Sequence, residues 1–445
     1  MRIALLAAVA SLIAGCDCNN PPTGGGGGGG SATGGGAGGG SGGGGAAPHW
    51  TYYELDPTAA ALDGHALAID PTDQRIGVAY FADTDGGSER EVRYVDWRNG
   101  TVSPPESWRT VHKRFGISLA YQPTGEPAVA YLGGGSDTSL DWTESDVEVA
   151  YRSNGNWTKS VPFTMSGQIA MAPCDTNVDT TGFVVGLWPA LAIVPVTGRT
   201  YLAFRDVHNG ANIQGDWGGS DLKLAEGVYP NWSGTCIAPA DTGAKAGVGN
   251  HNAIAIGAGD QPVIAFDLDN DGALAGDVYL TTRQVGGTWS APIYVFGTSN
   301  AGSGPSVAWD ADGGYGVAAG DKTTNIVSYR HSKDLTFWDS TEMVYGSGSG
   351  GWNASLAFDP NFGEPAVAFY TCSDAANQAE GHCPNAQLQL TQRVTGVWSH
   401  PLKIDDVGAA AAQSVVPRLA FLANGKRVVV YPVPPEGHLR LAIEN

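Results

Sequence analysis

Four aspartates in one short acidic stretch have the types and spacing of calcium ligands. The stretch reads DLDNDGALAGD, and in it Asp267, Asp269 and Asp271 alternate before Gly272. Alternate carboxylates can converge on one cation, and a glycine permits the sharp turn of a calcium loop. No glutamate follows at the twelfth position, so Asp277 is the expected substitute. We therefore predict a Ca²⁺ site at these four aspartates, with a solvated acidic hairpin as the alternative.

A second set of residues suited to ligand binding precedes short, small-residue strands that recur along the chain. It combines aromatic rings, which stack on sugars, with imidazole, amide and guanidinium groups, which hydrogen-bond to hydroxyls. The alternative is that these side chains plug a channel or cap strands. The predicted ligand-binding residues are Trp188, His251, Asn252, Trp352, Asn353 and Arg418, with Arg205 and Asp206 in a nearby loop.

An internal repeat reveals the elements that must position these residues. SLAYQPTGEPAVAY at 118–131 nearly recurs as SLAFDPNFGEPAVAFY at 355–370, and five looser copies share their layout. Each copy reads as short strands rich in Val, Ile, Tyr and Phe, separated by Gly, Pro, Asn and Asp. Spacings of about 50 to 70 residues are typical of four-stranded blades. The first strands start near Leu67, Leu119, Leu191, Ile254, Val307, Leu356 and Leu419.

We predict an all-β, seven-bladed β-propeller, with two smaller β-sandwich domains as the alternative. Six copies close with an outer strand led by tryptophan, but the seventh reaches Asn445 after its third strand. The segment HWTYYELD at 49–56 supplies a strand that starts at Trp50. Pairing it with the last blade would close the ring and remove an exposed sheet edge. The predicted propeller therefore spans 49–445.

The repeat layout resembles that of sialidase-like propellers with BNR repeats. The sequence SKDLTFW, from Ser332 to Trp338, is similar to the Asp-box turn of that family, but it lacks the glycine and has its tryptophan one place early. The resemblance implies a propeller fold and a structural turn. Sialidases need three arginines that grip a carboxylate, and no arginine occupies equivalent blade positions here, so sialidase activity is disfavoured.

Some seven-bladed polysaccharide lyases are similar in layout and use histidine and tyrosine as base and acid. That resemblance implies that His65 or His251, together with Tyr370, would be the counterparts in an enzyme. The folded part contains no HExxH, P-loop, dinucleotide fingerprint or nucleophile elbow.

The N-terminus has the layout of an exported lipoprotein. A short apolar run follows Arg2 and is too short to span a bilayer. The sequence IAGC, which ends at Cys16, resembles the lipobox of bacterial lipoproteins, in which the cysteine carries three acyl chains. We predict a signal peptide at 1–15, lipidation of Cys16 and a Gly-rich tether at 16–48, spanning roughly 30 Å. An ordinary signal peptide is the alternative.

The charge and the cysteines agree with export. A net charge of −20 disfavours nucleic acid as a partner, and cations or neutral glycans fit better. An oxidising compartment favours disulfides over a metal site. The expected disulfides join Cys372 to Cys383, across one loop, and Cys174 to Cys236.

Together these patterns predict a monomeric lipoprotein, anchored by its lipid at the outer membrane or cell surface, whose propeller binds a glycan or protein without catalysis. The periplasmic face of the inner membrane is a second location. The alternatives are a polysaccharide lyase or glycoside hydrolase acting at the mouth of the propeller, and a metal-binding or structural envelope protein.

Overall fold

The structure is a computed structural model. The chain divides into two units, 1–47 and 48–445, and the described residues belong to the second. The predicted signal peptide, Cys16 and the tether lie outside them. The described residues are 49–111, 115–133, 146–163, 174, 185–206, 220–238, 246–270, 277–284, 286–296, 303–310, 313–321, 326–346, 350–372, 383–408, 416–433 and 437–445.

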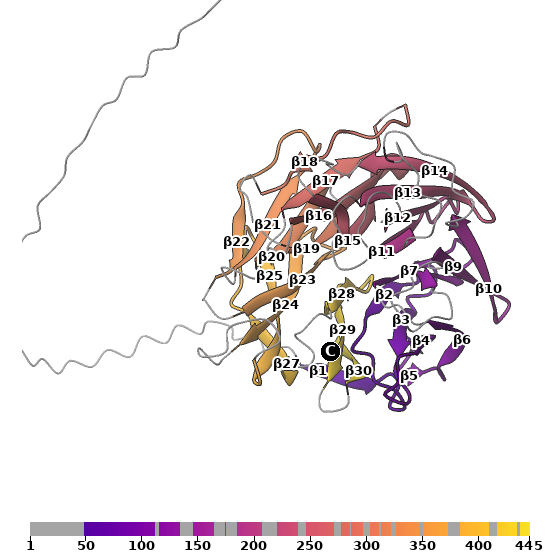
Figure 1. Ribbon diagram of the computed structural model, residues 1–445. Helices are drawn as coiled ribbons and strands as arrows, with labels where there is room; N and C mark the ends of the chain where they lie inside the picture. The colour runs from indigo at the N-terminus through magenta and orange to yellow at the C-terminus, as the bar shows by residue number, and fades with distance from the viewer. Residues whose placement is uncertain are drawn as a thin grey trace, which may run out of the picture. The chain divides into compact units, whose positions relative to one another are not determined.

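Seven antiparallel sheets, one for each predicted repeat, form a β-propeller, which confirms the predicted fold (Figure 1). Blade 1 comprises β2 (His65–Ile69), β3 (Ile76–Ala82), β4 (Arg90–Arg98), β5 (Thr101–Val102) and β6 (Glu106–Val111). Blade 2 comprises β7 (Ile117–Tyr121), β8 (Pro127–Gly133), β9 (Asp146–Ser153) and β10 (Asn156–Phe163). Blade 3 comprises β11 (Val185–Ile193), β12 (Thr200–Asp206), β13 (Asp221–Val228) and β14 (Asn231–Ala238).

The remaining blades follow the same order. Blade 4 comprises β15 (Ala246–Ile256), β16 (Pro262–Asn270), β17 (Val278–Thr282) and β18 (Ile293–Tyr294), with the 3₁₀ turn η2 (Ala258–Asp260) between its first two strands. Blade 5 comprises β19 (Ser303–Asp310), β20 (Gly314–Asp321), β21 (Ile326–Ser332) and β22 (Glu342–Tyr345). Blade 6 comprises β23 (Gly350–Phe358), β24 (Pro365–Cys372), β25 (Ala386–Val394), β26 (Val397–Trp398) and β27 (Leu402–Asp406). Blade 7 comprises β28 (Arg418–Phe421), β29 (Arg427–Val433), β30 (His438–Glu444) and β1 (Trp50–Glu54). In the part of the chain described, no helix is long and apolar enough to cross a membrane.

The core lies between the blades. Each of the seven clusters of buried apolar side chains draws on two neighbouring blades, including the pair formed by blades 7 and 1. The second strands read as nearly continuous apolar runs, such as IGVAYFA in β3 and PAVAYLG in β8, and every residue of both is buried. Both faces of a blade are covered by neighbours, so an unbroken apolar run replaces the in-out alternation of a one-sided sheet.

Serines in three innermost strands join adjacent blades. Ser118 Oγ accepts a hydrogen bond from Leu191 N, 2.9 Å away, and Ser355 Oγ accepts one from Leu419 N at 3.1 Å. Ser306 makes the equivalent bond to Leu356 N at 3.0 Å. The serine of each SLA or SVA triplet therefore accepts a hydrogen bond from a backbone N–H of the next blade and so satisfies that donor.

The tryptophans of the outer strands also bridge blades. Trp157 Nε1 donates to Glu106 of blade 1 at 2.7 Å, and Trp398 Nε1 donates to Glu342 of blade 5 at 2.8 Å. In blades 4 and 5 the prediction of a Trp-led strand is wrong in detail, because Trp289 and Trp338 precede β18 and β22.

β1 completes the last blade, as predicted. It pairs antiparallel with β30, with Trp50 opposite Glu444 and Glu54 opposite Arg440, and the C-terminus lies beside it in Figure 1. Tyr52 Oη donates to Ile404 O of blade 6 at 2.8 Å. The strand thus closes the ring and contacts the preceding blade.

The turn that resembles an Asp-box is held by its own serine and aspartate. Asp334 Oδ1 accepts bonds from Thr336 N and Phe337 N, both at 2.8 Å, and these bonds lower the pKa of Asp334. Ser332 Oγ accepts from Leu335 N at 2.8 Å. Leu335 takes the left-handed conformation, with φ of 60°, in a turn where the family pattern has a glycine one place later.

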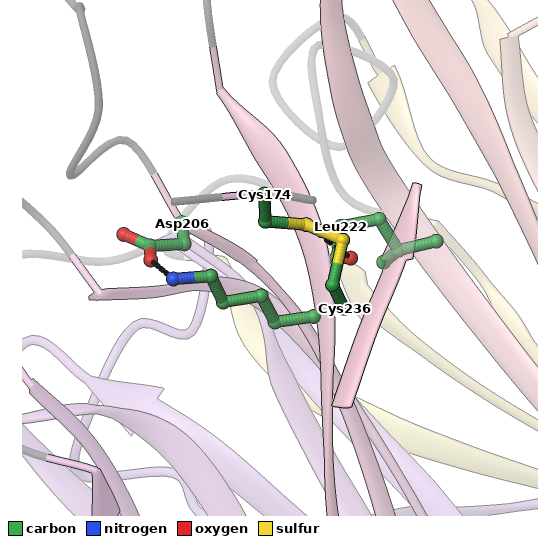
Figure 2. The surroundings of a disulfide bond; sticks show 5 residues. Cys174, Asp206, Leu222 and Cys236 are labelled. Atoms are coloured by element: carbon green, nitrogen blue, oxygen red, sulfur yellow. Dashed lines mark hydrogen bonds and ion pairs between the residues drawn. A yellow bond between two sulfur atoms is a disulfide. The ribbon is translucent and has the colours of Figure 1, made fainter. Parts of the chain in front are cut away.

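Both predicted disulfides are present, Cys174–Cys236 and Cys372–Cys383. Figure 2 shows the first of them beside Leu222 and the carboxylate of Asp206. Cys372 ends β24 and Cys383 precedes β25, so the second disulfide joins the two ends of one loop. Disulfides of this kind are typical of exported proteins.

Candidate functional site

The innermost strands of all seven blades surround a central cavity of about 230 Å³. Its wall includes the three interblade serines, Asn252 and Arg418. We call the end of this cavity at which the innermost strands begin the mouth, because the predicted ligand-binding residues precede or open those strands.

We take Leu67, Leu119, Leu191, Ile254, Val307, Leu356 and Leu419 as the reference residues of the seven repeats. In six repeats, the residue three positions before the reference residue has a left-handed backbone conformation. In blades 1, 2 and 5 it is a glycine, namely Gly64, Gly116 and Gly304. In blades 3, 4 and 6 it is Trp188, His251 or Asn353, with φ of 46°, 45° and 58°. Register shifts in β11, β15 and β23 mark these positions as β-bulges. A left-handed conformation is unfavourable for tryptophan and histidine, so their presence here indicates a requirement for the side chain.

Neighbouring blades fix the backbone of Trp188. Its N–H donates to Phe115 O of blade 2 at 2.7 Å, and its carbonyl accepts from Asn252 Nδ2 of blade 4 at 3.0 Å. A side chain at Gly116 would also be excluded, since its Cβ would lie 2.9 Å from Trp188 Cα.

The indole ring of Trp188 joins a cluster of aromatic and cationic groups. Its centroid lies 5.3 Å from the ring of His251 and 5.8 Å from that of Phe115. The guanidinium carbon of Arg205 lies over the indole, 5.3 Å from its centroid. The ring is only partly buried, so the cluster offers an aromatic surface at the mouth.

His251 is oriented by a buried carboxylate. Its Nδ1 lies 3.1 Å from Asp267 Oδ2, which also accepts Gly304 N of blade 5 at 3.0 Å. Because a carboxylate only accepts hydrogen bonds, Nδ1 carries the proton and Nε2 keeps its lone pair. The His251 side chain is 39% exposed and Nε2 has no hydrogen-bond partner among the described residues. Such an imidazole can accept a proton or bind a hydroxyl.

The other proposed acid–base pair is buried. His65 is 1% exposed and Tyr370 is 0% exposed, and both lie near Arg418. His65 Nε2 bonds to Val430 O at 3.0 Å, while His65 Nδ1 and Tyr370 Oη have no hydrogen-bond partner among the residues that the structure describes. Burial, with Arg418 nearby, lowers the pKa of His65 to about 3, and burial raises the pKa of Tyr370. Both groups are therefore neutral at pH 7, and a large substrate cannot reach them.

Two further predicted residues lie elsewhere than expected. Arg205 and Asp206 end strand β12 and are fully buried, so they are not in a loop. Arg205 Nε donates to Ser220 Oγ at 2.5 Å, and Asp206 pairs with Lys223, as Figure 2 shows for its carboxylate. Arg205 contacts the mouth through the ring of Trp188.

Of the two ligand-binding residues predicted in blade 6, only Asn353 has a described side chain. Asn353 is 8% exposed at its left-handed position. The backbone of Trp352 pairs with Tyr370, and the Trp352 side chain lies outside the described part.

The calcium hypothesis remains a prediction. β16 extends to Asn270, so Asp267 and Asp269 lie in the strand, where Asp267 contacts His251 rather than opening a loop. Asp277 precedes β17 and raises the pKa of Tyr294 in addition to the larger effect of burial. Asp271 lies outside the described residues. Within the described ranges, no group of three or more His, Cys, Asp or Glu side chains could hold a metal ion.

A larger cavity, of about 710 Å³, lies at the opposite ends of blades 3 and 4. Arg199 and Arg283 in its wall both bond to Glu226 Oε2, at 2.9 and 3.0 Å. Their guanidinium groups lie near the ring of Tyr201, 5.4 and 5.9 Å from its centroid. These cations therefore have a carboxylate partner.

Sequence reasoning located the mouth but missed its supporting residues. Phe115 contacts Trp188 across two blades, and the role of Asp267 follows from its contact with His251 on the adjacent strand of blade 4. The one signal in the sequence was the repeat position itself, where glycine in blades 1, 2 and 5 is replaced by Trp188 and His251 in blades 3 and 4.

Comparison with known proteins supports the fold. No family model and no curated protein matches the chain. A solved polysaccharide lyase of family PL25, an ulvan lyase bound to -[GlcA(1-4)Rha3S]-, is 13% identical, with a TM-score of 0.53, over 87% of this chain and 93% of its own.

Two further solved structures are more distant. An α-L-arabinofuranosidase of family GH93 from Fusarium graminearum is 14% identical, with a TM-score of 0.46, over 71% of this chain and 89% of its own. An intramolecular trans-sialidase from Ruminococcus gnavus is 11% identical, with a TM-score of 0.44, over 74% of this chain and 94% of its own. At these identities the likeness concerns the propeller fold alone.

Proposed function

We propose that this protein is an exported, membrane-anchored lipoprotein whose propeller binds a glycan at the mouth between blades 3 and 4. The observation that carries the proposal is the placement of Trp188 and His251 at left-handed positions that other blades give to glycine. Such strain persists at sites where the side chain is required. Trp188 supplies an aromatic face, and His251 Nε2 and its surroundings supply polar groups for hydroxyls.

Glycan binding is tested by a glycan array and calorimetry with the purified protein and two tryptophan variants. Trp188→Ala should weaken binding at least about tenfold, equivalent to about 1.4 kcal/mol. Trp309→Ala is the matched control, because Trp309 is also partly buried but lies at the far end of β19, where its ring packs on Tyr315. Equal affinity of the two variants, or no binding to any glycan, would contradict the proposal.

A second candidate function is β-elimination on a uronate-containing glycan. The Asp267–His251 pair favours it, since a carboxylate that holds Nδ1–H leaves Nε2 free to take the proton next to the uronate carboxyl group. His251 is the accessible member of the histidines predicted for this role, whereas His65 and Tyr370 are buried. The ulvan lyase is similar in fold, which permits this function without indicating it.

The two functions differ in one readout. A lyase releases unsaturated uronates, which absorb in the ultraviolet, and His251→Asn should abolish that signal while glycan affinity changes little. A binding protein gives affinity without any new absorbance or reducing ends. Product formed equally fast by wild type and His251→Asn would exclude His251 as the base.

The lipid anchor has its own test. Cys16→Ser should move the protein from the membrane fraction to the soluble fraction, because acylation would be lost. If the variant stays in the membrane fraction, the proposed lipidation is wrong, and a glycan-binding result is unaffected.

A further inference from the structure

Arg418 differs in size and charge from the residues at the same repeat position in the other blades, which line the narrow centre of the ring. It stands immediately before the reference residue of its repeat, where the other blades have serine or alanine. Those residues are Ala66, Ser118, Ala190, Ala253, Ser306 and Ser355. A long cationic side chain thus replaces a small neutral one in a single blade, at the wall of the central cavity.

The guanidinium of Arg418 lacks an acidic partner in the described part of the chain. Its Nε donates to the backbone carbonyl of His65 at 3.1 Å, and neither Nη atom bonds to a carboxylate there. The described residues of the cavity wall include no Asp or Glu. His65 is neutral, and burial lowers the pKa of Arg418 only to about 10, so the charge is present at pH 7. A partly buried charge without a carboxylate partner is costly. The absence of such a partner is unusual in a chain with 44 acidic and 24 basic residues.

The cavity also supplies neutral hydrogen-bond donors. Ser118, Ser306 and Ser355 each accept a backbone N–H through Oγ, so each retains its hydroxyl proton for donation. Within the described part of the chain, Tyr370 Oη has no hydrogen-bond partner, and it lies close enough to Arg418 for the two to influence each other's pKa. Asn252 Oδ1, also unpartnered, is the one acceptor of this group and suits a bridging water.

We propose that the central cavity binds a small anion against the Arg418 guanidinium. A volume of about 230 Å³ has room for a monovalent anion with several waters, since liquid water takes about 30 Å³ per molecule. The chemistry is that of a monovalent inorganic anion or a carboxylate, held by the guanidinium and serine hydroxyls. The anion compensates the charge of Arg418 at the point where the blades meet, so it stabilises the ring. This proposal does not rest on the glycan-binding function proposed above, although the cavity lies beside Trp188.

The test compares thermal unfolding of the purified protein in sodium chloride or nitrate with unfolding in sodium HEPES of equal ionic strength. Wild-type Tm should rise by roughly 2 °C in a saturable manner, because the anion binds only the folded state. Arg418→Ser should show no such rise, and serine suits this position because blades 2, 5 and 6 have it. Arg98→Gln, which removes an exposed arginine paired with Asp73, should respond like wild type.

Titrations with acetate and glucuronate identify the source of the anion. A response to chloride assigns the site to a free inorganic ion, whereas a response to carboxylates alone assigns it to an acidic group of a ligand. An anomalous peak beside the Arg418 guanidinium in crystals grown with bromide is the direct readout if Arg418→Ser does not fold. Equal responses of wild type and Arg418→Ser, or no response of wild type to any of these anions, would overturn the proposal.

Discussion

His251 combines a strained backbone with a carboxylate-held ring. A left-handed conformation costs a non-glycine residue about 1–2 kcal/mol, but asparagine tolerates it better. His251→Asn should therefore leave the free energy of unfolding unchanged or raise it by up to about 1 kcal/mol, while any β-elimination activity at the mouth is lost. Denaturant unfolding measures the first effect, and the ultraviolet absorbance of unsaturated uronates measures the second. A loss of stability above about 2 kcal/mol would show that the imidazole is mainly structural.

His65 should make the propeller sensitive to mild acid. Burial lowers its pKa from 6.5 to about 3, so between these values the unfolded chain binds more protons than the folded protein. Stability is then lost as pH falls from 6.5 toward 3, by about 1.4 kcal/mol per pH unit for one proton. Between pH 6.5 and 4.5, where most carboxylates do not yet titrate, the loss should reach about 2–3 kcal/mol.

The variant His65→Gln isolates this effect. Its Tm should fall less than that of wild type between pH 6.5 and 4.5, since no imidazole must be protonated on unfolding. Parallel Tm curves for the two proteins over this window would exclude His65 as the acid-sensitive group.

For individual residues, the sequence predicted the position of a side chain in the ring more accurately than the groups that it contacts. Repeat phase placed Trp188, His251 and Arg418 near one end of the ring, but it could not show that Asp267 bonds to an imidazole. Repeat spacing does not specify which side chains on adjacent strands of one blade bond to each other. Burial of Tyr370 was equally hidden, because its apolar neighbours belong to blade 7 as well as its own.

The innermost strands are held together by hydrogen bonds that cross between blades. Ser355→Ala leaves the N–H of Leu419 without its acceptor in a buried setting, which should cost about 1–3 kcal/mol. Ser107→Ala, at an exposed position of β6, should change stability by less than about 0.5 kcal/mol. Chemical denaturation measures both, and equal effects would mean that the interblade bond adds nothing.

Strand β1 should be essential to the stability of the whole ring. Deleting residues 49–56 removes the pairing with β30 and the bond from Tyr52 to blade 6, and exposes the edge of the last blade. We expect a loss of at least roughly 3–5 kcal/mol in the free energy of unfolding. Deleting 19–47 should leave the melting curve unchanged. A truncated ring that melts like the intact one would contradict the role of β1 as a closing strand.

The strands themselves were predictable because each repeat carries its own turn residues and apolar run. The outer strands of blades 4 and 5 were predicted less well. Tryptophan marked their start in sequence, yet Trp289 and Trp338 lie in the preceding turns. Both rings pack against apolar clusters shared with a neighbouring blade, and repeat spacing within one strand does not reveal this packing.

The two disulfides should contribute unequally to the stability of the molecule. Cys174 and Cys236 are 62 residues apart, whereas Cys372 and Cys383 are 11 apart. In the chain-entropy account, the longer loop contributes about 4 kcal/mol and the shorter about 3 kcal/mol. The Cys174→Ala/Cys236→Ala double variant should therefore melt below the Cys372→Ala/Cys383→Ala one. The reverse order would show that local packing outweighs loop length.

At the scale of the whole molecule, the number of repeats determined the architecture, since seven in-phase copies with complementary ends require a closed ring. The ligand was not predictable in the same way, because one propeller fold serves both binding proteins and enzymes of several kinds.

The meeting of the first and last strands has a further consequence for engineering. Asn445 N donates to His49 O at 2.9 Å, so a short peptide could join these two residues directly. The exposed hairpin at Asn154 and Gly155 could then carry new termini, as loop tips usually tolerate. A circularly permuted propeller of this kind would place its attachment point on blade 2 and leave the mouth intact.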